Sequence, residues 1–78
     1  MAKKDERRKN PILIEFAKKV RSRRYELGLT QEKLAEIAEF HVNFIGGIER
    51  ATRNPSLISI VKLASALKIN LRDLIPFK

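Results

Sequence analysis

The chain has 78 residues, with 17 Lys or Arg against 9 Asp or Glu and a formal net charge of +8. A chain of this length forms one domain at most, with a modest hydrophobic core. It contains no cysteine and one histidine, His41, which excludes disulfides and Cys/His metal clusters. No stretch approaches the roughly 20 apolar residues of a membrane span, and no signal-peptide-like apolar run follows the basic start, so a cytoplasmic protein is expected.

The positive charge is concentrated near the N-terminus, where residues 1–24 hold ten Lys or Arg and three Asp or Glu. A basic balance favours a polyanionic partner: nucleic acid first, then an anionic membrane or an acidic protein. Residues 1–9 show no apolar periodicity and are expected to be a disordered tail, either simply solvated or an arm that reaches DNA. The folded domain is expected to span residues 10–78.

The first predicted helix begins at Asn10-Pro11, an N-cap residue followed by proline, and ends at Gly28, a left-handed C-cap candidate. Arg24 is the one charged residue on its apolar stripe, and a buried charge is costly without a partner. The stripe follows helical spacing: Phe16, Val20, Arg24 and Leu27.

Thr30 is expected to cap a second, short helix, with Leu29 and Leu34 forming a hydrophobic staple around the cap. A turn over 39–41 then leads into a third helix over about 42–50. The apolar residues expected to face the core here are Ile45 and Ile48, with Phe40 just before them.

Two further helices complete the predicted fold. Ser56 caps the fourth, and Asn70 caps a short fifth helix that Pro76 ends. The predicted inner face of the fourth helix comprises Leu57, Ile60, Leu63, Ala64 and Leu67. The sequence therefore predicts an all-α fold of five helices.

A helix, a three-residue turn and a second helix is the helix-turn-helix arrangement, whose second helix enters the major groove of DNA. The segments "GLTQEKLAEIAEF", "IGGIER" and "RNPSLISIVKLASAL" resemble the Cro/repressor-type (XRE-like) helix-turn-helix family. The segment "IERATRNPSL" looks most like the small controller proteins of restriction–modification systems. The resemblance covers about residues 12–75 and implies a compact lambda-repressor-like DNA-binding domain.

The resemblance also implies roles for individual residues. Arg24 is expected to pair with Glu49, which would satisfy its charge and hold the first helix to the third. Gln31 is expected to bind a DNA phosphate at a helix N-terminus, assisted by Thr30. The other expected phosphate contacts follow the third helix: Arg50, Arg53 and Asn54.

Base contacts are expected from the outward side of the third helix. Asn43 can pair with adenine and Val42 can touch a thymine methyl, while His41 is a further candidate at the helix start. Gly46 and Gly47 lie opposite Ile45 and Ile48, and two interior glycines cost about 1 kcal/mol each relative to Ala. We expect them to clear the groove face for close approach to DNA; the alternative is a tolerant surface site.

Three positions depart from the family pattern. Glu39 and Ala51 stand where glycines usually end the second and third helices, and Val42 stands where controllers often carry a basic residue. The recognised base sequence therefore cannot be carried over by analogy.

One such domain makes few phosphate contacts, so a homodimer on a palindromic operator is expected. The C-terminal residues carry more apolar surface than a short helix can bury, and the alternative is that they complete the monomer's core. The predicted dimer residues are Ile69, Leu71, Leu74, Ile75 and Phe77.

The functional hypothesis is a transcriptional regulator of restriction–modification genes, with double-stranded DNA and a second copy as partners and RNA polymerase as a further candidate. The alternatives are a protein-interaction module, such as a coactivator or antitoxin partner, and non-specific polyanion or membrane binding through the basic N-terminal third. No cofactor or metal is expected. With one histidine, no cysteine and no glycine-rich phosphate loop, an enzyme is not expected either.

Overall fold

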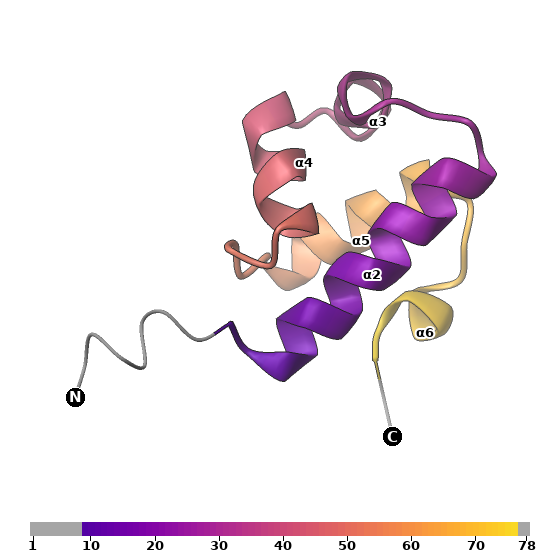
Figure 1. Ribbon diagram of the computed structural model, residues 1–78. Coiled ribbons are helices and arrows are strands. Elements are labelled where there is room, and N and C mark those ends of the chain that lie inside the picture. Colours follow the sequence, from indigo (N-terminus) through magenta and orange to yellow (C-terminus); the bar gives the residue numbers. More distant parts are fainter. Residues whose placement is uncertain (1–8, 77–78) are drawn as a thin grey trace.

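The computed structural model describes residues 9–76, where the chain forms five helices and no strand. They are α2 (Pro11–Glu26), α3 (Gln31–Ala38), α4 (Val42–Glu49), α5 (Leu57–Ala66) and α6 (Leu71–Leu74). Figure 1 shows α2 crossing in front of α5, with α3 and α4 above it and α6 below. The predicted all-α, five-helix fold is confirmed; of the predicted tail, only Lys9 lies within the described residues.

The helix starts follow their capping residues. Three of the four predicted caps accept a hydrogen bond from a backbone N–H two or three residues later, which satisfies one of the free donors of a helix N-terminus. Asn70 occupies the N-cap position of α6, as predicted, but its side chain makes no capping hydrogen bond. The three caps that bond are Asn10, Thr30 and Ser56, at 2.8, 3.0 and 3.1 Å.

Each of α2, α3, α4 and α5 is followed by a residue in the left-handed conformation. Gly28 follows α2 with φ +69°, as predicted, but Glu39, Ala51 and Lys68 adopt the same region with φ of 62°, 62° and 53°. The left-handed conformation costs a residue with a Cβ about 1–2 kcal/mol. Glu39 and Ala51 therefore keep the turn geometry that glycine usually supplies, at a cost in strain.

The core lies between α2, α3, α4 and α5, and α6 closes it from below. α3 packs on α4 and α5, α2 packs on α4 and α6, and α5 packs on α6. Leu57 was expected on the inner face of α5 but is 69% exposed, so that prediction was wrong. The largest fully buried side chains are Val20, Leu34, Ile45, Ile48, Leu63, Leu67 and Leu74.

Candidate nucleic-acid interface

The turn between α3 and α4 sets the angle between the two helices. α3 ends at Ala38, Glu39 redirects the chain in its left-handed conformation, and His41 begins the next helix as its N-cap. Phe40 packs against the core, and its ring centroid lies 4.7 Å from that of Phe44 on α4. This aromatic contact anchors the loop between the two helices on the first helical turn of α4.

The structure brings Arg24 and Glu49 together across the core. Arg24 Nε donates to Glu49 Oε2 at 2.7 Å and Nη2 donates to Oε1 at 2.9 Å, a bidentate arrangement. Both residues are more than nine-tenths buried. Arg24 Nη1 also donates to the backbone oxygen of Leu29 at 2.8 Å. The guanidinium thus joins α2, the start of α3 and the last turn of α4.

Electrostatics keep this carboxylate ionised. Burial alone would raise the pKa of Glu49, but hydrogen bonds from Arg24 and Gln31 and the positive charges of Arg24 and Arg21 outweigh burial and hold that pKa below its usual value. The hydrogen bond to Glu49 likewise raises the pKa of Arg24. Each partner stays charged because the other does.

Gln31 has a different partner from the one expected. Its side-chain Nε2 donates to Glu49 Oε1 at 3.0 Å, so the amide completes the coordination of the buried carboxylate. Thr30 lies beside it, exposed, with its hydroxyl oxygen engaged in capping α3 through the Lys33 N–H. A phosphate at this helix start would therefore meet the backbone N–H groups and the remaining hydrogen of the Gln31 amide.

Two arginines of α2 hold neighbouring helix ends. Arg23 donates to the backbone oxygens of Leu67 and Lys68, at 2.8 and 2.9 Å, at the end of α5. Arg21 donates to the backbone oxygen of Glu49 at 2.9 Å, at the end of α4. Positive charge at a helix C-terminus is favourable, so part of the basic charge of α2 stabilises the fold. The helical spacing of α2 does not predict these two contacts, because both partners are distant in sequence.

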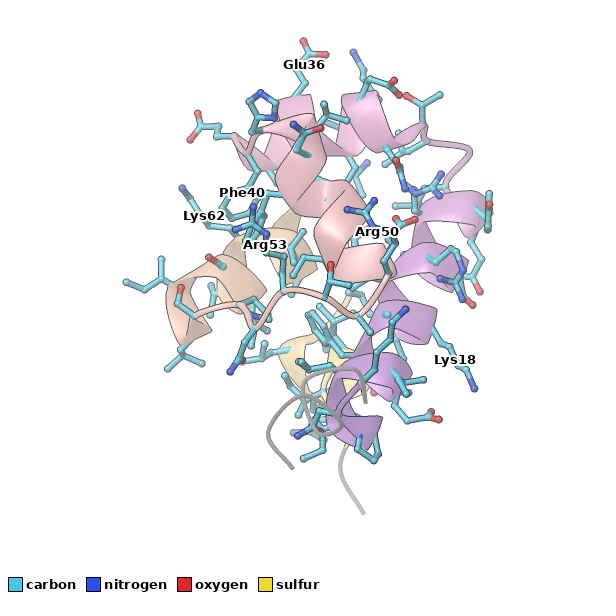
Figure 2. All side chains as sticks on the ribbon, turned by 60° about the vertical axis from the view of Figure 1, so that its left-hand side comes forward. Lys18, Glu36, Phe40, Arg50, Arg53 and Lys62 are labelled. Carbon is cyan, nitrogen blue, oxygen red and sulfur yellow. The ribbon has the colours of Figure 1, made fainter. Side chains whose placement is uncertain are left out.

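The outward side of α4 carries the predicted base-contacting residues. His41 and Asn43 are exposed and Val42 is half-buried. His41 Nδ1 accepts the Asn43 backbone N–H at 3.0 Å, so its ring is fixed as the cap of α4. Figure 2 shows α4 facing the viewer, with Arg50 and Arg53 lying against it.

The paired glycines are not an open surface. Gly46 and Gly47 are both buried, covered by the side chains of Arg50 and Arg53. A Cβ on Gly46 would lie 2.9 Å from Arg50 Nη1, and one on Gly47 would lie 2.5 Å from Arg53 Cγ. The expectation of bare backbone open to DNA was therefore wrong, because side chains of the same chain occupy that space.

The residues predicted for a dimer interface differ in how far they are buried in the monomer. Leu74 is fully buried and belongs to the monomer's core, so its assignment to an interface was wrong. Ile69 and Ile75 are half-buried, and Leu71 is 39% exposed. Phe77 lies outside the described residues.

A second set of apolar side chains on α5 was missed. Leu57, Ile58 and Val61 are 69%, 73% and 48% exposed. Their positions fall within about 100° of one another around a helix, so they share one side of α5. The signal was present in the run "LISIV", because four apolar residues in five cannot all face one core.

Two negative findings concern residues 9–76. These residues contain no group of three or more His, Cys, Asp or Glu placed to hold a metal ion. In the same part of the chain, no helix has both the length and the apolar character needed to cross a membrane.

Two short helices joined by a three-residue turn, with polar and basic side chains on the outward side of the second helix, are the arrangement of the helix-turn-helix class of DNA-binding domains. A family model described as helix-turn-helix matches residues 20–74. The chain therefore belongs to the helix-turn-helix family of DNA-binding transcription regulators, which is not a class of enzymes.

Within this family the chain is similar to controller proteins. It is 42% identical over 69 residues to the control protein C.BamHI of Bacillus amyloliquefaciens, covering 87% of this chain and 85% of that protein. It is 42% identical over 60 residues to the control protein C.SmaI of Serratia marcescens, covering 77% and 71%. The crystal structure of the restriction-modification controller protein C.AhdI from Aeromonas hydrophila superposes with a TM-score of 0.78 at 43% identity, covering 81% and 96%. The predicted resemblance to this group is confirmed.

Proposed function

We propose that this chain regulates restriction–modification genes by binding a palindromic operator in double-stranded DNA as a homodimer, in the cytoplasm. The observation that carries the proposal is the buried Arg24–Glu49 contact, which fixes α4 with His41 and Asn43 outward. Similarity to proteins named as control or controller proteins supports the same reading.

In this proposal α4 lies in the major groove and its N-terminal residues meet base edges. Asn43 offers an amide suited to adenine, and Val42 offers methyl groups suited to thymine. His41 stands at the helix start, where it contacts either a base edge or the backbone. Thr30 and Gln31 at the start of α3, and Arg53 and Asn54 after α4, contact phosphates and set the register of the protein on the duplex.

A homodimer follows from the requirement for two half-sites. Reading helices in successive major grooves lie about 34 Å apart in a two-fold dimer, and the two half-sites together supply enough contacts for tight binding. The exposed apolar side chains of α5 and α6 are the surface we assign to this contact, in place of the buried Leu74: Leu57, Ile58, Val61 and Leu71.

Selection of bound sequences from a random duplex pool tests the proposal. The wild-type chain is expected to select a two-fold symmetric consensus, with affinity that falls steeply as salt concentration rises. Asn43→Ala is expected to relax the preference at one base pair of each half-site, weakening binding to the consensus by about tenfold. Ser22→Ala, on the exposed surface of α2, is the matched control and should select the same consensus.

A pool that yields no consensus would contradict the proposal. It would favour the alternative of a protein-interaction module, in which Asn43→Ala changes nothing. Where operator binding activates transcription, RNA polymerase becomes the additional partner, and promoter assays with purified polymerase distinguish activation from repression.

A further inference from the structure

The guanidinium of Arg50 lies over the outward side of α4. An ideal Cβ on Gly46 would meet Arg50 Nη1 at 2.9 Å and Cζ at 3.8 Å, so the charged end of Arg50 fills the space of the absent side chain. The reach follows from helix geometry, because Cα–Cβ bonds tilt toward the helix N-terminus and residue 50 therefore covers residue 46. Gly46 thus provides room for a guanidinium within the turn that follows Asn43.

Arg53 follows α4 in the chain, and it is the stem of its side chain, not the charged end, that lies over Gly47. A Cβ on Gly47 would meet Arg53 Cγ at 2.5 Å, Nε at 3.3 Å and Cδ at 3.5 Å, so the stem of the side chain crosses the helix there. Its guanidinium ends 5.8 Å from the ring centroid of Phe44. Cation–π attraction to this ring holds the guanidinium against α4.

The donors of Arg50 are uncommitted. Within residues 9–76, no carboxylate lies within 4.0 Å of its guanidinium, and its side chain donates no hydrogen bond. The residue is exposed. A planar guanidinium on a helix in the major groove matches the O6 and N7 acceptors of guanine, which it binds through two parallel hydrogen bonds.

We infer that Arg50 reads a guanine in each half-site and that Gly46 determines this specificity by leaving room for its guanidinium. The inference rests on the proposed function, since it requires α4 to lie in the major groove. It replaces the expected phosphate contact of Arg50 and leaves that role to Arg53. The two glycines then leave room on α4 for two arginine side chains, Arg50 to contact a guanine and Arg53 to contact a phosphate.

Three single variants and one double variant test the inference on the operator that the wild-type chain selects. Arg50→Ala is expected to bind that operator about tenfold more weakly and to lose its preference at one G·C pair per half-site. Gly46→Ala should lose the same preference, because the added methyl displaces the guanidinium. It should still fold, since only the flexible end of Arg50 must move. Combining the two changes should cost no more than Arg50→Ala alone.

Arg53→Ala is the matched control. As a phosphate contact, it should weaken binding to every duplex by the same factor, keep the wild-type base preference and reduce the salt slope by about one. Binding is measured by fluorescence anisotropy against operators with each base pair changed in turn, at several salt concentrations. Thermal melting of each variant confirms that it is folded.

The inference is overturned if Arg50→Ala behaves as Arg53→Ala does, or if Gly46→Ala keeps the wild-type preference at every base pair. Failure of the proposed function looks different. In that case the wild-type chain itself selects no consensus, and no variant has a preference to lose.

Discussion

At the scale of single residues, one buried ion pair controls the geometry of the interface. Arg24 meets Glu49 through two hydrogen bonds, and Gln31 and Leu29 contribute further contacts around them. A buried pair adds little net stability compared with apolar residues of the same volume, but breaking it leaves an uncompensated charge. Its value here is orientation, since it fixes the end of α4 to α2 and to the start of α3.

Removing the negative partner tests this. Glu49→Gln is expected to lower the free energy of unfolding by about 3 kcal/mol at neutral pH, because the Arg24 guanidinium stays buried without a carboxylate. Urea denaturation followed by circular dichroism measures the loss. Glu15→Gln, whose carboxylate is exposed beside Lys18 at 3.7 Å, should change stability by less than about 0.5 kcal/mol.

The same residue predicts a pH dependence. The folded state lowers the pKa of Glu49, so its contribution is fully present above the ordinary glutamate pKa and is lost as pH falls through the lower folded value. Wild-type stability should decline as pH falls below the ordinary glutamate pKa, and the decline should be smaller in Glu49→Gln. An equal decline in both proteins would show that other carboxylates account for it.

At the scale of elements, the helix ends store strain. Glu39, Ala51 and Lys68 each hold a left-handed conformation that glycine adopts freely. In each case backbone hydrogen bonds reach back into the helix, as when Phe40 N–H donates to the Ala35 oxygen at 2.9 Å. The buried residues before and after each turn pack into the core, and this packing imposes the left-handed backbone conformation on the residue between them.

Glycine at two of these positions is expected to stabilise the protein. Glu39→Gly and Lys68→Gly should each raise the free energy of unfolding by about 0.5–1 kcal/mol, because relief of the left-handed strain exceeds the added entropy of the unfolded chain. Lys19→Gly, an exposed position within α2, should instead lose about 1 kcal/mol. Thermal and urea melts compare the three. A loss at Glu39→Gly as large as that at Lys19→Gly would contradict the argument.

At the scale of the whole molecule, the exposed apolar surface of α5 and α6 has no cover within residues 9–76. Leu57 and Ile58 are about seven-tenths exposed, and Leu71 lies on the neighbouring helix α6. Exposed apolar side chains are typical of an interface between protomers, and α5 and α6 both carry them. A second copy placed there is the arrangement we propose for the homodimer.

Charged substitutions test the assembly. Ile58→Glu and Leu71→Glu are expected to shift the protein from dimer to monomer in sedimentation equilibrium, while helix content stays unchanged because both side chains are exposed. Operator affinity should fall when the dimer dissociates, since a monomer binds only one half-site. Ile12→Glu on α2, which is 63% exposed, is the matched control and should remain dimeric. Dimers that survive both substitutions would place the interface elsewhere.

The sequence by itself determined the helices and most of the core, because capping residues and helical spacing are local signals. Asn10, Thr30 and Ser56 begin helices as their side chains require, and Phe16 and Val20 face inward as their spacing predicts. Only the tertiary structure decided what depends on residues distant in sequence or on side-chain reach: the partner of Gln31, the burial of Leu74, the exposure of Leu57 and the covering of the two glycines. The physical reason is that spacing assigns a residue to one side of a helix, whereas packing decides what covers that side.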